Sequence, residues 1–373
     1  MRILVVSRPF VFHGGVERAT VGFVEALVAH GHDVHLLSPR GQQPLRGVTV
    51  HVLALPPVPA PARVLVLPLA VRLAVRRRAW DVVQSHERTL SQDVYRAGEG
   101  CHRGYLAAMG PRFHRRAAYH RLLLALERRV LQRTPQVVAI SRLGAGEIAE
   151  RYGVPESRLS VVYNGVDLGR FHPERRARDR AGARDEAALP AGAWTALFAG
   201  SGFERKGLAT ALEALARVDD DASRLLVLGK GDTRPYARLA ERLGVAARVA
   251  WLGTRPDIER WYAAADVLVL PTRYEPFGNV HLEALAAGLP VVTTTRAGGA
   301  EIVTAECGAV VEPRDPDAVA RALARLRAAP PARVTAAARA AAEPFTYERQ
   351  VAGFEKIYRR LPTAQAAFPL RNR

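Results

Sequence analysis

Cysteine is nearly absent from this sequence. Its two cysteines, Cys101 and Cys307, lie far apart, and neither belongs to a CxxC or other metal-like spacing. A disulfide framework and a zinc site are therefore not expected. Because disulfides are rare in cytosolic proteins, the composition favours the cytoplasm, with 373 residues held together by packed apolar cores.

Long apolar runs are also absent. The run VLVLPLAVRLAV (64–75) is shorter than the roughly 20 residues that cross a bilayer, and it contains Pro68 and Arg72. The N-terminal segment MRILVVSRPF lacks the apolar core of a signal peptide. The sequence therefore predicts neither a signal peptide nor a membrane span.

Lysine is scarce, although the formal net charge is +18. The sequence contains only Lys206, Lys230 and Lys356, so arginine supplies nearly all of the positive charge. Such an excess suits a nucleic acid, a membrane surface or an anionic substrate. A GC-rich genome that encodes arginine in place of lysine would give the same balance. In that case a retained lysine marks a position that needs lysine, and Lys206 is the candidate.

Several cofactor motifs are missing. The first strand leads into SRPFVFHGGVER, which has a glycine pair but no GxGxxG, and this disfavours a dinucleotide dehydrogenase. No GxxxxGK[ST] loop, no HExxH and no cluster of His and Cys occur. The sequence therefore predicts no cofactor and no metal.

Strand-like and helix-like segments alternate in two series, which predicts an α/β protein with mainly parallel sheets. The segment between the series, YNGVDLGRFHPERRARDRAGARDEAALPAGA, is interpreted as a linker with a solvated helix. We therefore expect two Rossmann-like domains, 1–168 and 169–344, followed by an amphipathic helix at 345–361. Ligands of such folds bind at the carboxyl ends of the strands, in a cleft between the two domains. The expected strands are 3–6, 34–37, 48–53, 82–85, 137–140 and 159–163 in the first series, and 195–200, 224–229, 248–253, 267–271, 290–294 and 308–313 in the second.

The strongest local pattern is PTRYEPFGNVHLEALAAG at 271–288, where a strand ends, a loop carries Glu275 and a helix opens near Gly278. The start of a helix binds anions, and glycine allows a phosphate to approach the backbone. Glu283 follows on the helix. The alternative, in which Glu275 only caps the helix and Glu283 is solvated, stays open at this point.

A second strand end, loop and helix start is GSGFERKGLATALEAL at 200–215. Arg205 and Lys206 stand at the start of a helix, where cations oppose the helix dipole. A bound anion would reverse that penalty, so Lys206 is predicted to be a phosphate ligand.

These motifs resemble family 4 of the retaining glycosyltransferases. EPFGNVHLE matches the E-x7-E motif of that family, GFERKG its basic pair, YNGVDLGRF its interdomain segment and GGVER its glycine loop. The resemblance covers nearly the whole chain and is greatest to members that add glucose to a lipopolysaccharide core. It implies the GT-B fold, in which two Rossmann-like domains face each other across a deep cleft and the C-terminal helix crosses back to the N-terminal domain.

The resemblance also implies a role for each matching residue. Domain 169–344 would bind a nucleotide sugar, with UDP-glucose favoured and GDP and ADP sugars open, and domain 1–168 would bind the acceptor. Glu275 and Glu99 would act at the reacting centre, and no metal would be needed. The implied donor-binding residues are Gly14, Gly15, Arg205, Lys206, Arg255, Phe277, Gly278, Asn279 and Glu283.

A basic stretch at 102–133 contains eight arginines and one acid, Glu127, among apolar side chains. This composition is typical of a segment that binds anionic lipid. Together with the resemblance, it predicts a monomeric enzyme peripheral to the inner face of a bacterial inner membrane, acting on an anionic saccharide or glycolipid. The arginines proposed to contact the membrane are Arg112, Arg115, Arg116 and Arg121.

Two other functions remain open. A nucleotide-sugar epimerase with the GT-B fold would share the phosphate-binding residues but need different acids and bases. A nucleic-acid-binding protein would explain the net charge, but it requires basic and exposed aromatic residues on one face, which the distribution does not favour.

Overall fold

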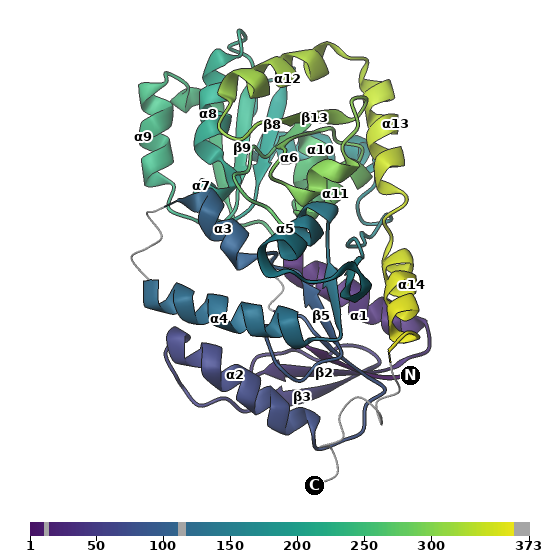
Figure 1. Cartoon of the computed structure of the whole chain (residues 1–373). Coiled ribbons are helices and arrows are strands. Elements are labelled where there is room, and N and C mark those ends of the chain that lie inside the picture. The colour runs from purple at the N-terminus through teal and green to yellow at the C-terminus, as the bar shows by residue number, and fades with distance from the viewer. Residues whose placement is uncertain (11–14, 111–116, 362–373) are drawn as a thin grey trace. The chain divides into compact units, whose positions relative to one another are not determined.

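The computed structural model describes residues 1–10, 15–110 and 117–361 (Figure 1). The chain divides into two compact units. Unit 1 comprises Met1–Gly165 and the segment that begins at Tyr347, and unit 2 comprises Val166–Thr346. Each unit contains one sheet in which every pair of neighbouring strands is parallel.

The sheet of unit 1 has the order β3-β2-β1-β4-β5-β6-β7, so the direction of winding reverses between β1 and β4. The sequence did not predict β5, because its four residues, VYRA, place an arginine inside a strand. Arg96 is nevertheless buried, and its guanidinium donates to Asn164 Oδ1 at 2.6 Å. The strands are β1 (Arg2–Val6), β2 (Asp33–Pro39), β3 (Val48–Leu53), β4 (Val82–Ser85), β5 (Val94–Ala97), β6 (Gln136–Ala139) and β7 (Leu159–Val161).

The helices of unit 1 follow the apolar spacing and caps of the sequence. Ser141 caps α5 by accepting from Gly144 N at 3.0 Å, and Gly153 ends that helix at φ +64°. The helices are α1 (Gly15–Ala29), α2 (Ala60–Val75), α3 (His102–Met109), α4 (Ala117–Arg133), α5 (Arg142–Tyr152) and α14 (Tyr347–Tyr358).

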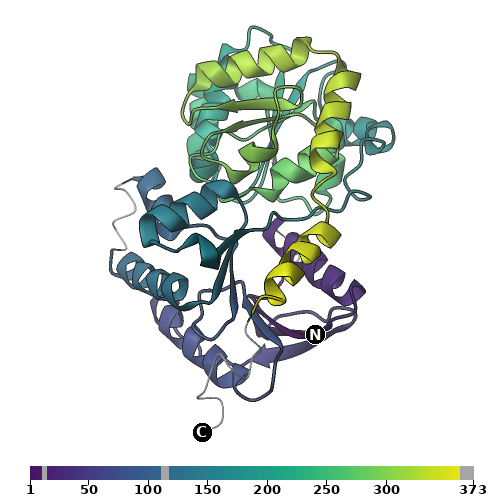
Figure 2. The same cartoon turned by 45° about the vertical axis from the view of Figure 1, so that its right-hand side comes forward.

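Helix α14 belongs to the core of unit 1, although it follows unit 2 in the chain (Figure 2). Phe354 is fully buried, and its ring lies 4.9 Å from that of Phe23 on α1. Tyr358 donates a hydrogen bond to Gln84 Oε1 on β4 at 2.5 Å. The predicted final helix is therefore present, and it contacts helix α1 as the resemblance implied.

The sheet of unit 2 has the order β10-β9-β8-β11-β12-β13, which is the 3-2-1-4-5-6 order of a Rossmann fold. All six strands that the sequence predicted in the second series are present. They are β8 (Thr195–Ala199), β9 (Arg224–Leu228), β10 (Val249–Gly253), β11 (Val267–Val269), β12 (Val291–Thr294) and β13 (Gly308–Val311). The helices are α6 (Arg175–Glu186), α7 (Phe203–Lys206), α8 (Leu208–Arg217), α9 (Arg234–Arg242), α10 (Ile258–Ala264), α11 (Asn279–Ala286), α12 (Pro316–Ala328) and α13 (Pro331–Ala342).

The interpretation of α6 as a solvated linker helix was wrong. Arg180 donates to the carbonyl oxygens of residues 263–265 at the end of α10, at 2.8–3.1 Å. Arg176 and Arg180 both pair with Asp266, at 2.5 and 2.9 Å. Cations stabilise the carboxyl end of a helix, so the charges that suggested solvation attach α6 to unit 2. No helix in the described ranges is long and apolar enough to cross a membrane.

Candidate functional site

The two loops that the sequence singled out lie next to each other in unit 2. The loop 200–207 follows β8, and the loop 270–278 follows β11. These strands are paired, with Val267 opposite Ala196, at the point where the winding of the sheet reverses. The carboxyl ends of parallel strands at such a point form the usual ligand site of a doubly wound sheet.

Backbone contacts fix the two loops against each other. The carbonyl oxygen of Arg205 accepts from Arg273 N at 2.8 Å and from Thr272 Oγ1 at 2.9 Å. Gly207 has φ +78°, and a Cβ there would lie 1.9 Å from the carbonyl oxygen of Pro271. Only glycine fits this position, because it meets both the left-handed conformation and the close approach. Gly207 also separates the short α7 from α8, so Lys206 ends α7 just before α8 begins.

The predicted cations and Glu275 form one ion-pair cluster. Glu275 Oε2 lies 2.6 Å from Lys206 Nζ and 2.7 Å from an Arg205 guanidinium nitrogen. The side chains of Lys206 and Glu275 are 8% and 11% exposed, so both charges are largely removed from water. The carboxylate of Glu275 thus interacts with these two cations rather than with the first backbone N–H groups of α11.

The pKa values of Glu275 and Lys206 reflect a balance between burial and the neighbouring charges. Burial would raise the pKa of Glu275, but the Lys206 and Arg205 charges outweigh it and lower the pKa to about 2. Burial lowers the pKa of Lys206, with Arg205 acting in the same direction and Glu275 opposing both. A carboxylate with two cations leaves one net positive charge, which is an attractive environment for a diphosphate.

A buried histidine that sequence reasoning missed supports the start of α11. Gly278 has φ +83°, and a Cβ there would lie 2.4 Å from His281 Nδ1. That nitrogen lies 3.0 Å from the carbonyl oxygen of Gly278 and 3.2 Å from that of Phe277. Because carbonyl oxygens only accept, Nδ1 donates, and Nε2 is left to interact with Thr293 Oγ1 at 2.9 Å. Burial and the nearby Lys206 charge lower the pKa of His281 to about 4, so its ring is neutral near pH 7.

Glu283 is buried rather than solvated. It is 6% exposed, and one of its oxygens accepts from Tyr262 Oη at 2.8 Å. Phe277, just before α11, is completely buried, and Asn279 is the first residue of that helix. The alternative of a solvated residue on the outer face of a helix is therefore wrong for Glu283.

Arg255 makes contacts within unit 2. Its guanidinium pairs with Glu186 of α6 at 2.9 Å and lies 5.1 Å from the centre of the Trp261 ring. Its Nε donates to the carbonyl oxygen of Leu252 at 3.1 Å. These contacts hold the side chain against α6 and α10, and a role in binding a base stays a prediction.

Glu99 belongs to a second charged cluster, in unit 1. It pairs with Arg8 and, at 2.7 Å, with Arg88, which also contacts the buried Glu127 at 3.1 Å. Burial would raise the pKa of Glu99, but the two guanidinium charges lower it to about 2. Glu99 is therefore a paired carboxylate, and a role at the reacting centre stays a prediction.

His86 lies close by in sequence, at the carboxyl end of β4. Its Nε2 is 2.8 Å from Gln84 Nε2, and Gln84 in turn accepts from Tyr358. Its Nδ1 is buried and has no hydrogen-bond partner among the described residues. Burial lowers the pKa of His86 well below its usual value, and the Arg96 and Arg8 charges act in the same direction, so the ring is neutral.

Some predicted residues fall outside the described residues, namely Gly14, Arg112, Arg115 and Arg116. Gly15 is the first residue of α1, and Arg121 is exposed on α4. Within the described ranges, no group of three or more His, Cys, Asp or Glu side chains could hold a metal ion.

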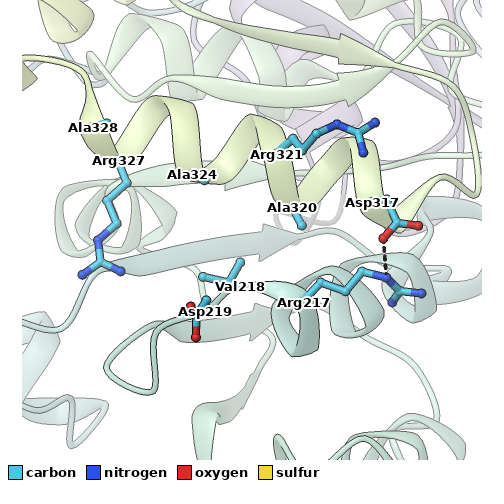
Figure 3. A pocket seen from close by; sticks show the side chains of 9 residues that line it. All are labelled: Arg217, Val218, Asp219, Asp317, Ala320, Arg321, Ala324, Arg327 and Ala328. Atoms are coloured by element: carbon cyan, nitrogen blue, oxygen red, sulfur yellow. Dashed lines mark hydrogen bonds and ion pairs between the residues drawn. The ribbon is translucent and has the colours of Figure 1, made fainter.

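A pocket elsewhere in unit 2 contains none of the predicted residues. It lies at the end of α8 remote from Lys206, beside α12, and its opening carries the ion pair between Arg217 and Asp317 (Figure 3). Its other lining residues are Val218, Asp219, Ala320, Arg321, Ala324, Arg327 and Ala328. Because it lacks a buried charged cluster, the loops after β8 and β11 are the stronger candidate site.

Comparisons with known proteins agree with this geometry. Residues 13–170 match the family described as Glycosyltransferase Family 4, and residues 194–328 match Glycosyl transferases group 1. The lipopolysaccharide glucosyltransferase WaaG of Escherichia coli K12 is 30% identical over 225 residues, 59% of this chain and 60% of that protein. The D-inositol 3-phosphate glycosyltransferase of Streptomyces scabiei is 34% identical over 253 residues, 62% of this chain and 55% of that protein.

The fold resembles a crystal structure of WaaG, described as a glycosyltransferase involved in lipopolysaccharide biosynthesis. The TM-score is 0.80 at 25% identity, over 94% of this chain and 98% of that chain. With its two parallel Rossmann-like sheets and a C-terminal helix on α1, the protein has the GT-B glycosyltransferase fold. The chain belongs to glycosyltransferase family 4. The matched regions span between 49% and 63% of the curated relatives' own lengths.

Proposed function

We propose that the protein is a retaining, metal-independent glycosyltransferase that moves a hexose from a nucleotide sugar to an anionic saccharide or glycolipid acceptor. One observation carries the proposal: Lys206, Arg205 and Glu275 meet at the carboxyl ends of β8 and β11. The name of one relative, the lipopolysaccharide glucosyltransferase WaaG, favours glucose as the sugar, and UDP-glucose as the donor is part of the same proposal.

The donor would bind to unit 2. Lys206 and Arg205 would neutralise the diphosphate, because fixed charges stabilise the charge that develops on a leaving group. Backbone N–H groups around Phe277, Gly278 and Asn279 would donate hydrogen bonds to the same phosphates. Glu283 would accept hydrogen bonds from ribose hydroxyls, and Arg255 would contact the base. Glu275 would orient the sugar through its oxygens while keeping Lys206 in place.

The reaction that fits these residues breaks the bond between the anomeric carbon and the phosphate oxygen. The acceptor hydroxyl oxygen forms the new bond on the same face, and its proton passes to the departing phosphate. Lys206 and Arg205 stabilise the negative charge on that phosphate. Glu275 and Glu283 would not flank one glycosidic bond, so they do not form the carboxylate pair of a glycosidase.

The acceptor is proposed to bind to unit 1. Glu99 is proposed to act at the reacting centre and Gly14 and Gly15 to contact the donor from this unit, and His86 presents a buried Nδ1 at the end of β4. A membrane-held acceptor would place the enzyme on the inner face of a bacterial inner membrane. The localisation and the monomeric state are part of this proposal.

Thermal unfolding with a panel of UDP, GDP and ADP sugars tests the donor. A ligand at 100 times its Kd stabilises the folded state by about 2.7 kcal/mol, so a matching donor raises Tm measurably. The shift should be the same with EDTA as with Mg²⁺. No shift with any donor, or a shift that requires Mg²⁺, contradicts the proposed site.

Product analysis separates this proposal from epimerase activity. A transferase joins the sugar to an added acceptor and releases the nucleoside diphosphate. An epimerase instead changes the configuration of the sugar without an acceptor. A changed sugar in the absence of acceptor would therefore contradict the transferase proposal.

A further inference from the structure

Helix α2 exposes a row of leucines that the apolar core does not use. Leu65, Leu69 and Leu73 are 61%, 60% and 55% exposed, respectively. They follow one another at intervals of four residues, so they lie along one face of the helix. Exposed leucines are common singly, but three in a row on one helix form a continuous apolar strip.

The inner face of α2, opposite the exposed leucines, packs the helix against the sheet of unit 1. Val71 and Val75 are buried with Leu4, Val6 and Val83 of the sheet in one core cluster. At about 100° per residue, positions two apart point in nearly opposite directions, so the row 67, 71, 75 faces the sheet and the row 65, 69, 73 faces away from it. The outer face of α2 therefore carries apolar side chains that the sheet does not cover.

Arginines accompany the exposed leucines. Arg72 and Arg76 fall on the same side of the helix as the leucines, and Arg77 and Arg78 continue from its end. All four are exposed. The sequence contains no Asp or Glu between residues 34 and 80, although it contains seven arginines there. The surface of α2 therefore combines apolar side chains with uncompensated positive charge.

We propose that the outer face of α2, with Leu65, Leu69, Leu73, Arg72, Arg76, Arg77 and Arg78, binds the surface of an anionic lipid bilayer. The leucines enter the boundary between headgroups and acyl chains, and the arginines contact lipid phosphates. The helix lies in the plane of the surface, because its 16 residues extend about 24 Å and a charge at Arg72 interrupts the apolar run.

Charge decides between a bilayer and a second copy of this chain. A symmetric dimer through α2 would bring the same arginines of two copies together, and like charges repel. An anionic bilayer offers the opposite charge and an apolar interior at once. The partner that complements both properties is therefore lipid.

This surface differs from the one that the sequence predicted at 102–133. In the described part of that stretch, Arg121, Arg128 and Arg129 are exposed, but the leucines of α4 are at least partly covered. Helices α2 and α4 contact each other in unit 1 (Figure 1). The arginines of α4 thus add charge beside α2, while the apolar contact comes from α2.

Co-sedimentation of the full chain with vesicles tests the proposal. Phosphatidylcholine vesicles that contain phosphatidylglycerol should bind the protein at least tenfold more tightly than phosphatidylcholine alone, and high salt should weaken the binding. Leu69→Gln and the pair Arg76→Gln/Arg77→Gln should each weaken it several-fold. The matched controls are Val310→Gln, at another exposed apolar residue, and Arg238→Gln/Arg242→Gln on α9, which should bind like the wild type.

A fluorescent label shows where the bilayer is contacted. Cys101 and Cys307 are both buried, so Leu69→Cys introduces an exposed thiol for an environment-sensitive dye. The dye should shift to the blue on anionic vesicles, and by more than a dye at Arg121→Cys. A shift only at position 121, equal binding to both kinds of vesicle, or no binding would overturn the proposal. So would a concentration-dependent dimer that Leu69→Gln abolishes.

The biological role of this surface rests on the proposed function, in which the acceptor is held in a membrane. Binding to vesicles can nevertheless be measured without donor or acceptor. If nucleotide sugars fail to raise Tm but the vesicle results hold, the surface stands and the transferase proposal falls. If donors bind and the α2 variants bind vesicles like the wild type, the surface proposal falls and the transferase proposal stands.

Discussion

Lys206 Nζ and Glu275 Oε2 lie 2.6 Å apart, although 69 positions separate the two residues in the chain. One follows β8 and the other follows β11, and the pairing of those strands brings them together. The ion pair holds the Lys206 ammonium group in a largely buried position. Its attraction for a phosphate is less screened there than at the surface. Glu275 thus opposes the burial that lowers the pKa of Lys206.

Replacement of Lys206 tests the phosphate contact. Lys206→Ala should reduce kcat/KM by about 10²–10³, because it removes stabilisation of the charge on the leaving group. Binding of the product nucleoside diphosphate should weaken as well. The measurements are steady-state kinetics and calorimetric titration with UDP, and Lys356→Ala on α14 is the control for loss of a lysine. A Lys206→Ala variant that is folded and has wild-type kinetics would remove Lys206 from the mechanism.

The two glutamates should fail in different ways. Glu283→Ala should mainly raise the KM for the donor, because ribose contacts are similar in the ground and transition states. Glu275→Gln should mainly lower kcat, because the position of the sugar decides the reaction geometry. It should not weaken UDP binding, since it removes a negative charge beside Lys206 and Arg205. Tyr262→Phe, which deletes the hydroxyl bound to Glu283, should resemble a mild form of Glu283→Ala. Loss of affinity alone in both glutamate variants would contradict this division of roles.

Stability should fall in mildly acidic solution because of His281. Its pKa is about 4 in the folded protein and about 6.5 when exposed, so below pH 6.5 the unfolded chain binds a proton that the folded chain does not. The free energy of unfolding is therefore highest above pH 6.5 and decreases by up to about 3 kcal/mol as the pH falls towards 4. Glu275 adds nothing in most of this window, because its lowered pKa matters only below about pH 4.5.

Urea unfolding between pH 4.5 and 7.5 measures this dependence. His281→Gln should flatten the profile, and His86→Gln should flatten it as well, since burial also lowers the pKa of His86. An unchanged slope in both buried-histidine variants would show that other groups cause the pH dependence.

Gly207 should resist substitution mainly because of its close approach to Pro271, and this effect can be separated from that of its positive φ. Gly207→Ala and Gly244→Ala both place a Cβ at positive φ, +78° and +70°, but nothing lies within 4 Å of a Cβ at 244. Gly244→Ala should cost only the conformational penalty of about 1–2 kcal/mol. Gly207→Ala should cost about 1–3 kcal/mol more, because its Cβ meets Pro271, and it should also weaken UDP binding. Equal losses of stability in the two variants would rule out the close approach.

The sequence predicted the two loops well because strand ends and helix starts are local features. Lys206 stood out for its rarity and Glu275 for its place before a helix. Their ion pair was not predicted, since it depends on the pairing of β8 with β11 over 69 positions. Strand β5 was missed for a related reason, because the partner that compensates buried Arg96 is Asn164, 68 positions away.

Burial of polar side chains was the least predictable property. Residues 279–286 contain apolar positions on several sides, so the pattern alone does not show that His281 and Glu283 face inwards. The same ambiguity affected α2, where the run at 64–75 showed apolar character but not which leucines the sheet would leave uncovered. Periodicity reveals an inner face only when the other face is polar.

Helix α14 has a consequence for the order in which the protein matures during synthesis. Domains generally fold from the N-terminus as they leave the ribosome, but unit 1 lacks Phe354 and Tyr358 until residues 347–358 have been made. Phe23 and Gln84 therefore lack their contacts with α14 until the whole of unit 2, a continuous segment, has been translated. The N-terminal unit is therefore the last to be completed, and a nascent chain that stops before Tyr347 can complete unit 2 alone.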